Sequence, residues 1–181
     1  METAIKRLNW GCGGWAVPGW INSDIKEGPG IDISCDIRDG LPLEENSIEY
    51  IMAAHALPEI SYPDLVPTLQ ELRRVLKPGA TLRLSLPDLL KGVAAFQRND
   101  VDYFLIPDEE VKKVGAKLIV QLIWYGYSRT LFTPDFIEEM LLKAGFSQAH
   151  HCEYQETKSG HAEIIELDNR ENESLFIEAV K

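Results

Sequence analysis

Short apolar runs separated by turn residues recur along the whole chain. Some alternate apolar with polar residues and others are continuous, the two patterns typical of half-buried and fully buried strands. Helical or irregular segments connect them, so the order predicts an α/β sheet whose parallel strands are joined by right-handed crossovers. The predicted strands are residues 8–10, 20–25, 31–37, 48–54, 80–86, 147–154 and 174–180.

Two segments between these strands carry apolar residues at helical spacing. The first helix, over residues 64–76, is predicted to end with a basic last turn and a breaker at Lys77-Pro78-Gly79. The second is predicted to begin after the N-cap Thr133 and to stop at Gly145 as a C-terminal cap. Its inward-facing residues are predicted to be Phe136, Ile137, Met140, Leu141 and Leu142.

Residues 87–129 depart from the alternation of strands and helices. They are helical in composition and include Tyr103, Phe104, Trp124, Tyr125 and Tyr127. A helical insertion at this point could cover a crevice and recognise a substrate. Alternatively, its aromatic side chains pack in the core or at an oligomer contact. Both interpretations stay open, and a homodimer is one expectation.

Composition narrows the class of protein. The 181 residues are 45% hydrophobic and 26% charged, which predicts a single globular domain spanning residues 1–181. The net charge of −11 opposes a broad grip on nucleic acid, because that affinity comes from Lys and Arg neutralising phosphates. No apolar stretch reaches the roughly 18 residues of a membrane span, so we expect a cytoplasmic protein without membrane insertion.

The cysteines and histidines give no sign of a metal site. Cys12, Cys35 and Cys152 are odd in number and widely spaced, which argues against a disulfide framework and against a structural zinc site. The four histidines form no ligand pattern either. We therefore expect no metal in this protein.

The first strand runs straight into a glycine turn, Gly11-Cys12-Gly13-Gly14. Three glycines within four residues let the backbone turn sharply and let a ligand approach closely. In an open parallel sheet, such a turn lies at the carboxyl ends of the strands, where ligands bind. The alternative is a plain tight turn after an edge strand.

Acidic residues lie near the ends of the next two predicted strands. Asp24 could accept hydrogen bonds from both hydroxyls of a ribose, and Asp36 with Ile37 would suit the amine and the face of an adenine. The alternative for each carboxylate is a solvated strand end. Asp24 lies 11 residues after Gly13, whereas the NAD fingerprint places its acidic residue about 20 residues further on, and the G-x-G-x-x-G spacing is absent. A nicotinamide-dependent oxidoreductase is therefore disfavoured.

Together these segments resemble the class I S-adenosylmethionine-dependent methyltransferases, in particular the small type 11 members. The resemblance covers residues 8–180 and is carried by Leu8-Asn9-Trp10-Gly11-Cys12-Gly13-Gly14, Pro18-Gly19-Trp20-Ile21-Asn22-Ser23-Asp24, and Leu72-Arg73-Arg74-Val75-Leu76-Lys77-Pro78-Gly79-Ala80. It implies a Rossmann-like, mostly parallel seven-stranded sheet flanked by helices, with strand order 3-2-1-4-5-7-6 and an antiparallel strand 7.

The resemblance also implies a set of cofactor-binding residues. S-adenosylmethionine would lie with its methionine and ribose portions beside Gly11, Cys12 and Gly13, its ribose on Asp24, and its adenine on Asp36 and Ile37. Ala54 and His55 would lie near the sulfonium. Asn9 is also expected to bind the cofactor, in the place of the acidic residue that usually precedes the glycines. Trp15 replaces the last glycine, and Pro58 replaces a carboxylate after the fourth strand.

Residues for the chemistry are harder to assign, because methyl transfer chiefly requires alignment and the exclusion of water. His55 is a candidate general base, with packing or cofactor contact as the alternative. Tyr125, Tyr127 and Arg129 could line an acceptor pocket, Arg129 facing an acceptor carboxylate or phosphate; a surface arginine is the alternative.

The leading hypothesis is a methyltransferase acting on a small-molecule or glycan or lipid-precursor acceptor. The second is a catalytically inactive S-adenosylmethionine-binding or regulatory protein with the same fold.

Overall fold

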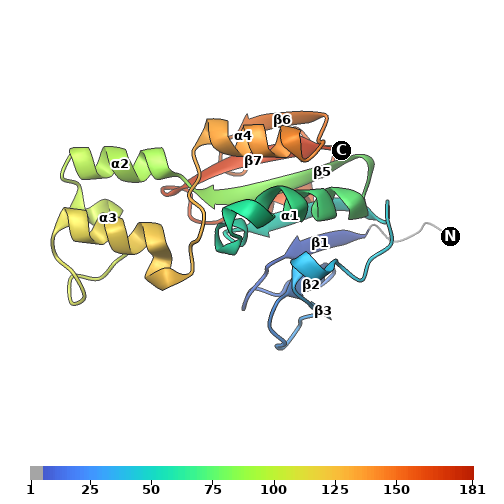
Figure 1. Ribbon diagram of the computed structural model, residues 1–181, viewed down its shortest axis with the longest axis horizontal. Helices are drawn as coiled ribbons and strands as arrows, with labels where there is room; N and C mark the ends of the chain where they lie inside the picture. The colour runs from blue at the N-terminus through green and yellow to red at the C-terminus, as the bar shows by residue number, and fades with distance from the viewer. Residues whose placement is uncertain (1–5) are drawn as a thin grey trace.

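The computed structural model describes residues 6–181 and contains one seven-stranded sheet in the order β3-β2-β1-β4-β5-β7-β6 (Figure 1). Neighbouring strands are parallel except β7, which runs antiparallel to both β5 and β6. The predicted strand order and the predicted antiparallel strand are therefore confirmed. The strands are β1 (Arg7–Trp10), β2 (Ile21–Asp24), β3 (Ile33–Ser34), β4 (Ile48–Ala54), β5 (Leu76–Pro87), β6 (Gln148–Cys152) and β7 (Ser174–Val180).

Five strands differ from their predicted boundaries: β1, β2 and β6 by one or two residues at an end, and β3 and β5 by more. β3 has only two residues, because Asp36 caps the short 3-10 helix η1 (Ile37–Asp39) and ends the extended backbone early. β5 starts at Leu76, so Lys77-Pro78-Gly79 belongs to the strand rather than to a helix end. Leu76 has extended backbone angles and closes the helix that precedes it.

The α-helices that contact the sheet pack on one of its faces. α1 (Tyr62–Val75) buries Leu65, Leu69 and Leu72, and α4 (Pro134–Lys143) buries Ile137, Met140 and Leu141. These side chains form the main core with the alternate residues of β4 and β5 that face them. Gly145, with a φ of +95°, ends α4 as predicted. The prediction for Leu142 is wrong, since it is 48% exposed, and Thr133 precedes the helix without a capping hydrogen bond.

The opposite face of the sheet is covered by the long segment 153–173 between β6 and β7. This segment contains only the short 3-10 helix η5 (Ala162–Ile165). Ile164 packs there with Trp20, Tyr50 and Met52 in a second, smaller core. The residues between β1 and β2, where a helix would be usual, are turns and irregular backbone, as the Pro18-Gly19 breaker predicts.

The predicted insertion after β5 is helical. α2 (Leu89–Gln97), η3 (Val101–Tyr103), α3 (Val114–Ile123) and η4 (Trp124–Gly126) form it, with α2 and α3 packed on each other beyond the end of the sheet (Figure 1). A further 3-10 helix, η2 (Leu57–Glu59), follows β4. Across residues 6–181, no helix has the length and apolar character needed to span a membrane.

A buried charge cluster joins β5 to the covering segment. Arg83 is fully buried and forms ion pairs with Asp168 at 2.6 Å and with Glu178 at 2.9 Å. Its guanidinium also donates to the carbonyl oxygens of Glu156 and Glu153, and it lies over the Phe176 ring. Because each charge has a partner, the cluster fixes segment 153–173 against the sheet.

Arg83→Ala should lower the free energy of unfolding by about 3–5 kcal/mol, because it leaves two buried carboxylates without a cation. The matched change Arg98→Ala breaks an exposed pair with Asp100 and should cost less than about 1 kcal/mol. Urea unfolding of both variants measures the difference. Equal losses would show that the buried cluster does not hold the segment.

Candidate functional site

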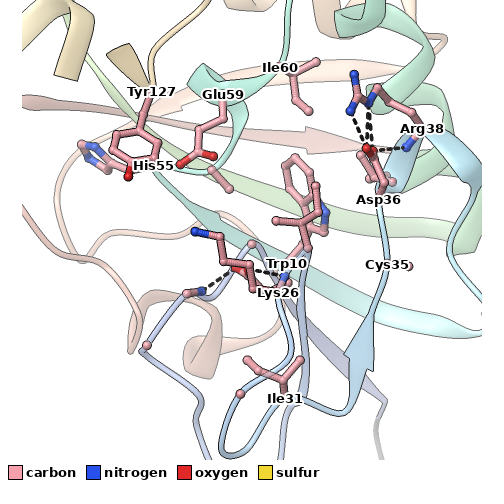
Figure 2. Close-up of a pocket in the computed structure, with 18 of the residues that line it drawn as sticks. Trp10, Lys26, Ile31, Cys35, Asp36, Arg38, His55, Glu59, Ile60 and Tyr127 are labelled. Atoms are coloured by element: carbon pink, nitrogen blue, oxygen red, sulfur yellow. Dashed lines mark hydrogen bonds and ion pairs between the residues drawn. The ribbon is translucent and has the colours of Figure 1, made fainter. Parts of the chain in front are cut away.

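A cavity of about 910 Å³ opens at the carboxyl ends of β1, β2 and β4 (Figure 2). The strand order reverses direction at β1, which has β2 on one side and β4 on the other, so the cavity lies at the topological switch point of the sheet. Its walls come from four segments of the chain, residues 10–14, 24–38, 55–64 and 126–129. The volume falls in the range of about 300–1,000 Å³ typical of ligand and cofactor sites.

The glycine turn forms one wall, and its glycines are required for two different reasons. Gly11 has a φ of +65°, and a Cβ there would lie 2.2 Å from the Cβ of Ala56, so a side chain is excluded by packing. A Cβ on Gly13 or Gly14 would meet no atom within 4 Å. These two glycines therefore leave open a part of the cavity that side chains would fill.

Buried amides set the shape of this turn. The Asn22 Oδ1 accepts hydrogen bonds from the Asn9 Nδ2 at 3.1 Å and from the Val17 backbone N–H at 2.9 Å. The Asn9 Nδ2 also donates to the Trp15 carbonyl at 3.1 Å. Asn9 is buried and does not line the cavity, so it supports the turn from behind.

Cys12 lies outside the cavity as well. Its side chain is buried, and burial together with the charge of Asp24 raises the pKa of the thiol to about 11. The thiol is therefore protonated at neutral pH. Its backbone N–H donates to the Ser23 carbonyl at 3.0 Å, which ties the turn to β2.

Asp24 ends β2 on the cavity wall. Its Oδ2 accepts from the Gly13 backbone N–H at 2.8 Å, and its Oδ1 accepts from the Lys26 N–H at 3.0 Å. Each carboxylate oxygen can accept more than one hydrogen bond, so both retain acceptor capacity toward the cavity. The carboxylate thus orients the glycine turn and is still able to accept from a ligand.

Asp36 and Ile37 also line the cavity, but Asp36 already has a cation as its partner. Arg38 Nε donates to both carboxylate oxygens, at 2.9 and 3.0 Å, and the guanidinium holds the pKa of the carboxyl below its usual range. A ligand amine at Asp36 would compete with Arg38. Ile37 is buried at the cavity wall and presents an apolar surface.

His55 follows β4 with a φ of +56° and lines the cavity. Its Nε2 lies 2.7 Å from the Ser174 Oγ. Burial, and secondarily the charge of Arg170, lowers the pKa of the imidazole to about 3. His55 is therefore neutral at pH 7 and a weak proton acceptor. Ala54, its neighbour, packs against the smaller core and does not line the cavity.

Of the three residues predicted to bind the methyl acceptor, two line the cavity and Tyr125 does not. Trp124, Tyr125 and Gly126 all have positive φ, which turns the chain away from α3 so that Tyr127 and Arg129 reach the cavity. Tyr125 lies apart from the cavity, where its hydroxyl donates to Glu110 at 2.9 Å.

The sequence analysis did not predict several of the residues that line the cavity, among them Trp10, Lys26 and Glu59. Trp10 was assigned to the first strand only, and Lys26 to an unremarkable loop. Glu59 lies four residues after His55, and its position directly after the fourth strand was the available signal. Within residues 6–181 no cluster of three or more His, Cys, Asp or Glu side chains could hold a metal ion.

We compared the sequence and the structure with those of known proteins. Residues 21–84 match the methyltransferase domain family. A search of curated proteins found no match. The family match covers less than half of the chain, and the whole sheet has the fold of the class I S-adenosylmethionine-dependent methyltransferases. The family match and the fold imply S-adenosylmethionine as the cofactor, and we set the oxidoreductase hypothesis aside.

Solved methyltransferases share the fold at low sequence identity. An S-adenosylmethionine-dependent methyltransferase from Thermotoga maritima superposes with a TM-score of 0.60 at 16% identity, over 97% of this chain and 82% of its own. One from Mesorhizobium loti gives 0.57 at 18%, over 98% and 91%. A chain from a complex of the Haloferax volcanii Trm112 methyltransferase activator with a methyltransferase gives 0.56 at 14%, over 99% and 83%.

The cavity of this methyltransferase fold suits S-adenosylmethionine in space and charge. Gly13 and Gly14 leave room for the methionine and ribose portions beside the backbone. The Asp24 carboxylate can still accept hydrogen bonds from the ribose hydroxyls. Five carboxylates and three basic side chains line the cavity, an acidic balance that favours a cationic sulfonium. The acidic members are Asp24, Glu27, Asp36, Glu59 and Asp64, and the basic members are Lys26, Arg38 and Arg129.

His55 should make stability depend on pH. Its folded pKa of about 3 lies below the usual 6.5, so its contribution is present above pH 6.5 and is lost as the pH falls toward 3. Between pH 7.5 and 5, the wild type should lose about 1–2 kcal/mol more free energy of unfolding than His55→Asn. Asn tolerates the positive φ and does not titrate. Urea unfolding at both pH values tests this, and identical pH dependence in the two proteins would contradict it.

Proposed function

We propose that this protein is an active methyltransferase that transfers the methyl group of S-adenosylmethionine to a small-molecule acceptor, which includes the reactive end of a glycan or lipid precursor. The observation that carries the proposal is the hydrogen bond between Asp24 and Gly13 on the wall of the cavity. It joins a ribose-binding carboxylate to the glycine turn that leaves room for the cofactor. Residues 1–181 act in this proposal as one domain.

In this proposal the protein binds the cofactor and the acceptor and aligns them, while the cofactor supplies an electrophilic methyl group. Gly11 and Gly13 receive the methionine and ribose portions, Asp24 accepts from the ribose hydroxyls, and Ile37 packs against the adenine. Arg38 already pairs with Asp36, so the adenine amine must share that carboxylate. Alignment of two reactants and exclusion of water supply most of what methyl transfer requires.

Tyr127 and Arg129 form the acceptor side in this proposal. Both line the cavity and belong to the chain that returns from the insertion. The net charge of −11 opposes a nucleic acid acceptor, because phosphates would be repelled over most of the surface. His55 is assigned to cofactor contact rather than to base catalysis, because it is neutral and weakly basic.

A second candidate is a cofactor-binding protein without transfer activity. The engagement of Asp36 by Arg38 and of His55 by Ser174 favours it, since both groups already have protein partners. Product formation distinguishes the two candidates, while cofactor binding is common to both.

Thermal melts test the cofactor. S-adenosylmethionine or S-adenosylhomocysteine at a hundredfold its Kd should stabilise the protein by about 2.7 kcal/mol. For a domain of this size the Tm should rise by roughly 5–10 °C, and NAD should leave it unchanged. No rise with either S-adenosyl compound would overturn the proposal.

The variant Gly14→Leu tests whether the cofactor binds beside the glycine turn. A side chain there meets no protein atom within 4 Å and enters the cavity, so the apo protein should keep its stability while S-adenosylhomocysteine binds at least about 10-fold more weakly. Gly160→Leu is the matched control, because its Cβ is equally unobstructed but lies in a surface loop. Isothermal titration should find wild-type affinity for it. Equal affinities in both variants would place the ligand elsewhere.

A further inference from the structure

Glu59 is the last residue of η2, and its carboxylate points into the cavity beside Tyr127 (Figure 2). Three of the other four cavity carboxylates are already engaged by the protein, and the fourth, Glu27, is exposed to solvent. Asp24 accepts from two backbone N–H groups, Asp36 pairs with Arg38, and Asp64 accepts from the Ser61 hydroxyl. Among residues 6–181, no hydrogen bond or ion pair reaches the Glu59 carboxylate, so this acceptor is available to a ligand.

Charged groups on both sides of the cavity act on Glu59. Burial and the negative charge of Asp24 raise the pKa of its carboxyl, and Lys26 and Arg129 oppose that rise. His55, four residues earlier, is neutral and supplies no cation. A cationic ligand between Glu59 and Asp24 would relieve the repulsion between these two carboxylates.

We infer that the Glu59 carboxylate faces the methyl group to be transferred, a position that suits an amine as the methyl acceptor. The inference rests on the proposed function and adds to it the acceptor class and one catalytic residue. Its structural basis is the juxtaposition of an unpartnered carboxylate, the neutral His55 and the Tyr127 ring on the wall across from the glycine turn.

The amine reacts in its neutral form, and the positive charge of the sulfonium lies next to Glu59 when the reaction starts. The nitrogen lone pair forms the bond to the methyl carbon as the carbon–sulfur bond breaks, and the bonding pair stays on sulfur. The positive charge thereby passes from sulfur to nitrogen. Glu59 then takes the proton of the methylated nitrogen, which leaves a neutral methylamine and S-adenosylhomocysteine.

Negatively charged acceptors fit poorly next to the Glu59 carboxylate. A carboxylate or phosphate acceptor would bring a second negative charge to Glu59, and like charges in one site destabilise each other. Arg129 lies on the same wall and is exposed, so it can bind an anionic group elsewhere on the acceptor without displacing the amine. An amine brings no negative charge to Glu59 and becomes positively charged as it is methylated, so it suits this carboxylate.

Three cofactor analogues test the inference without a known acceptor. S-adenosylhomocysteine is neutral at sulfur, S-adenosylmethionine carries the sulfonium, and sinefungin places an ammonium where the methyl group would be. All three share the amino-acid ammonium. Isothermal titration should show that wild-type protein binds sinefungin more tightly than S-adenosylhomocysteine, and that Glu59→Gln reduces this preference by about 10-fold.

Glu27→Gln is the control, because Glu27 lines the same cavity on an exposed loop and removes the same charge. Because Glu27 is exposed to solvent, its removal should leave the preference for sinefungin over S-adenosylhomocysteine close to the wild-type value. If Glu59→Gln weakens all three equally, Glu59 binds the shared ammonium and the inference is wrong. If it changes none, Glu59 faces no cation and the inference is also wrong. Failure of wild type to bind S-adenosylhomocysteine would instead refute the proposed function.

Discussion

The buried hydrogen bond between Asn9 and Asn22 is the interaction on which the cavity depends. A helix after β1 would satisfy its own backbone, but here the chain forms an irregular loop that needs side-chain partners. Asn22 supplies them by accepting from the Val17 N–H and donating to the Val17 and Trp20 carbonyls. Asn9 holds the Trp15 carbonyl. The glycine turn therefore keeps one shape, and Gly13 can meet Asp24.

The covering of the second face of the sheet also depends on the absence of a helix between β1 and β2. With no helix between β1 and β2, segment 153–173 covers that face through the small core around Tyr50 and Met52 and through the Arg83 cluster. Buried ion pairs are specific in geometry because removal of either partner leaves a costly bare charge. The same segment leads into Ser174, whose hydroxyl contacts His55. Coverage of the sheet and the geometry of the cavity are thus coupled through one stretch of chain.

The sequence allowed the fold to be predicted well because periodicity reports which side chains are buried. It predicted the strand order, the insertion and the position of Asp24, all of which depend on local patterns or on the resemblance. It did not predict the pairing of Asp36 with Arg38, the removal of Tyr125 from the cavity or the orientation of Glu59. Those depend on side-chain directions after turns with unusual backbone angles, as at Trp124 and Tyr125, and no spacing rule encodes them. Segment 153–173 was predicted only as a polar loop for a similar reason, since its buried partners are distant in sequence.

The central claim is that the cavity at the switch point holds S-adenosylmethionine with its ribose on Asp24. A crystal structure of the protein with S-adenosylhomocysteine tests it most directly. We expect the ligand within the cavity, with both ribose hydroxyls within hydrogen-bonding distance of the Asp24 carboxylate and the homocysteine portion against the glycine turn. A ligand bound elsewhere, or one whose ribose points away from Asp24, would contradict it.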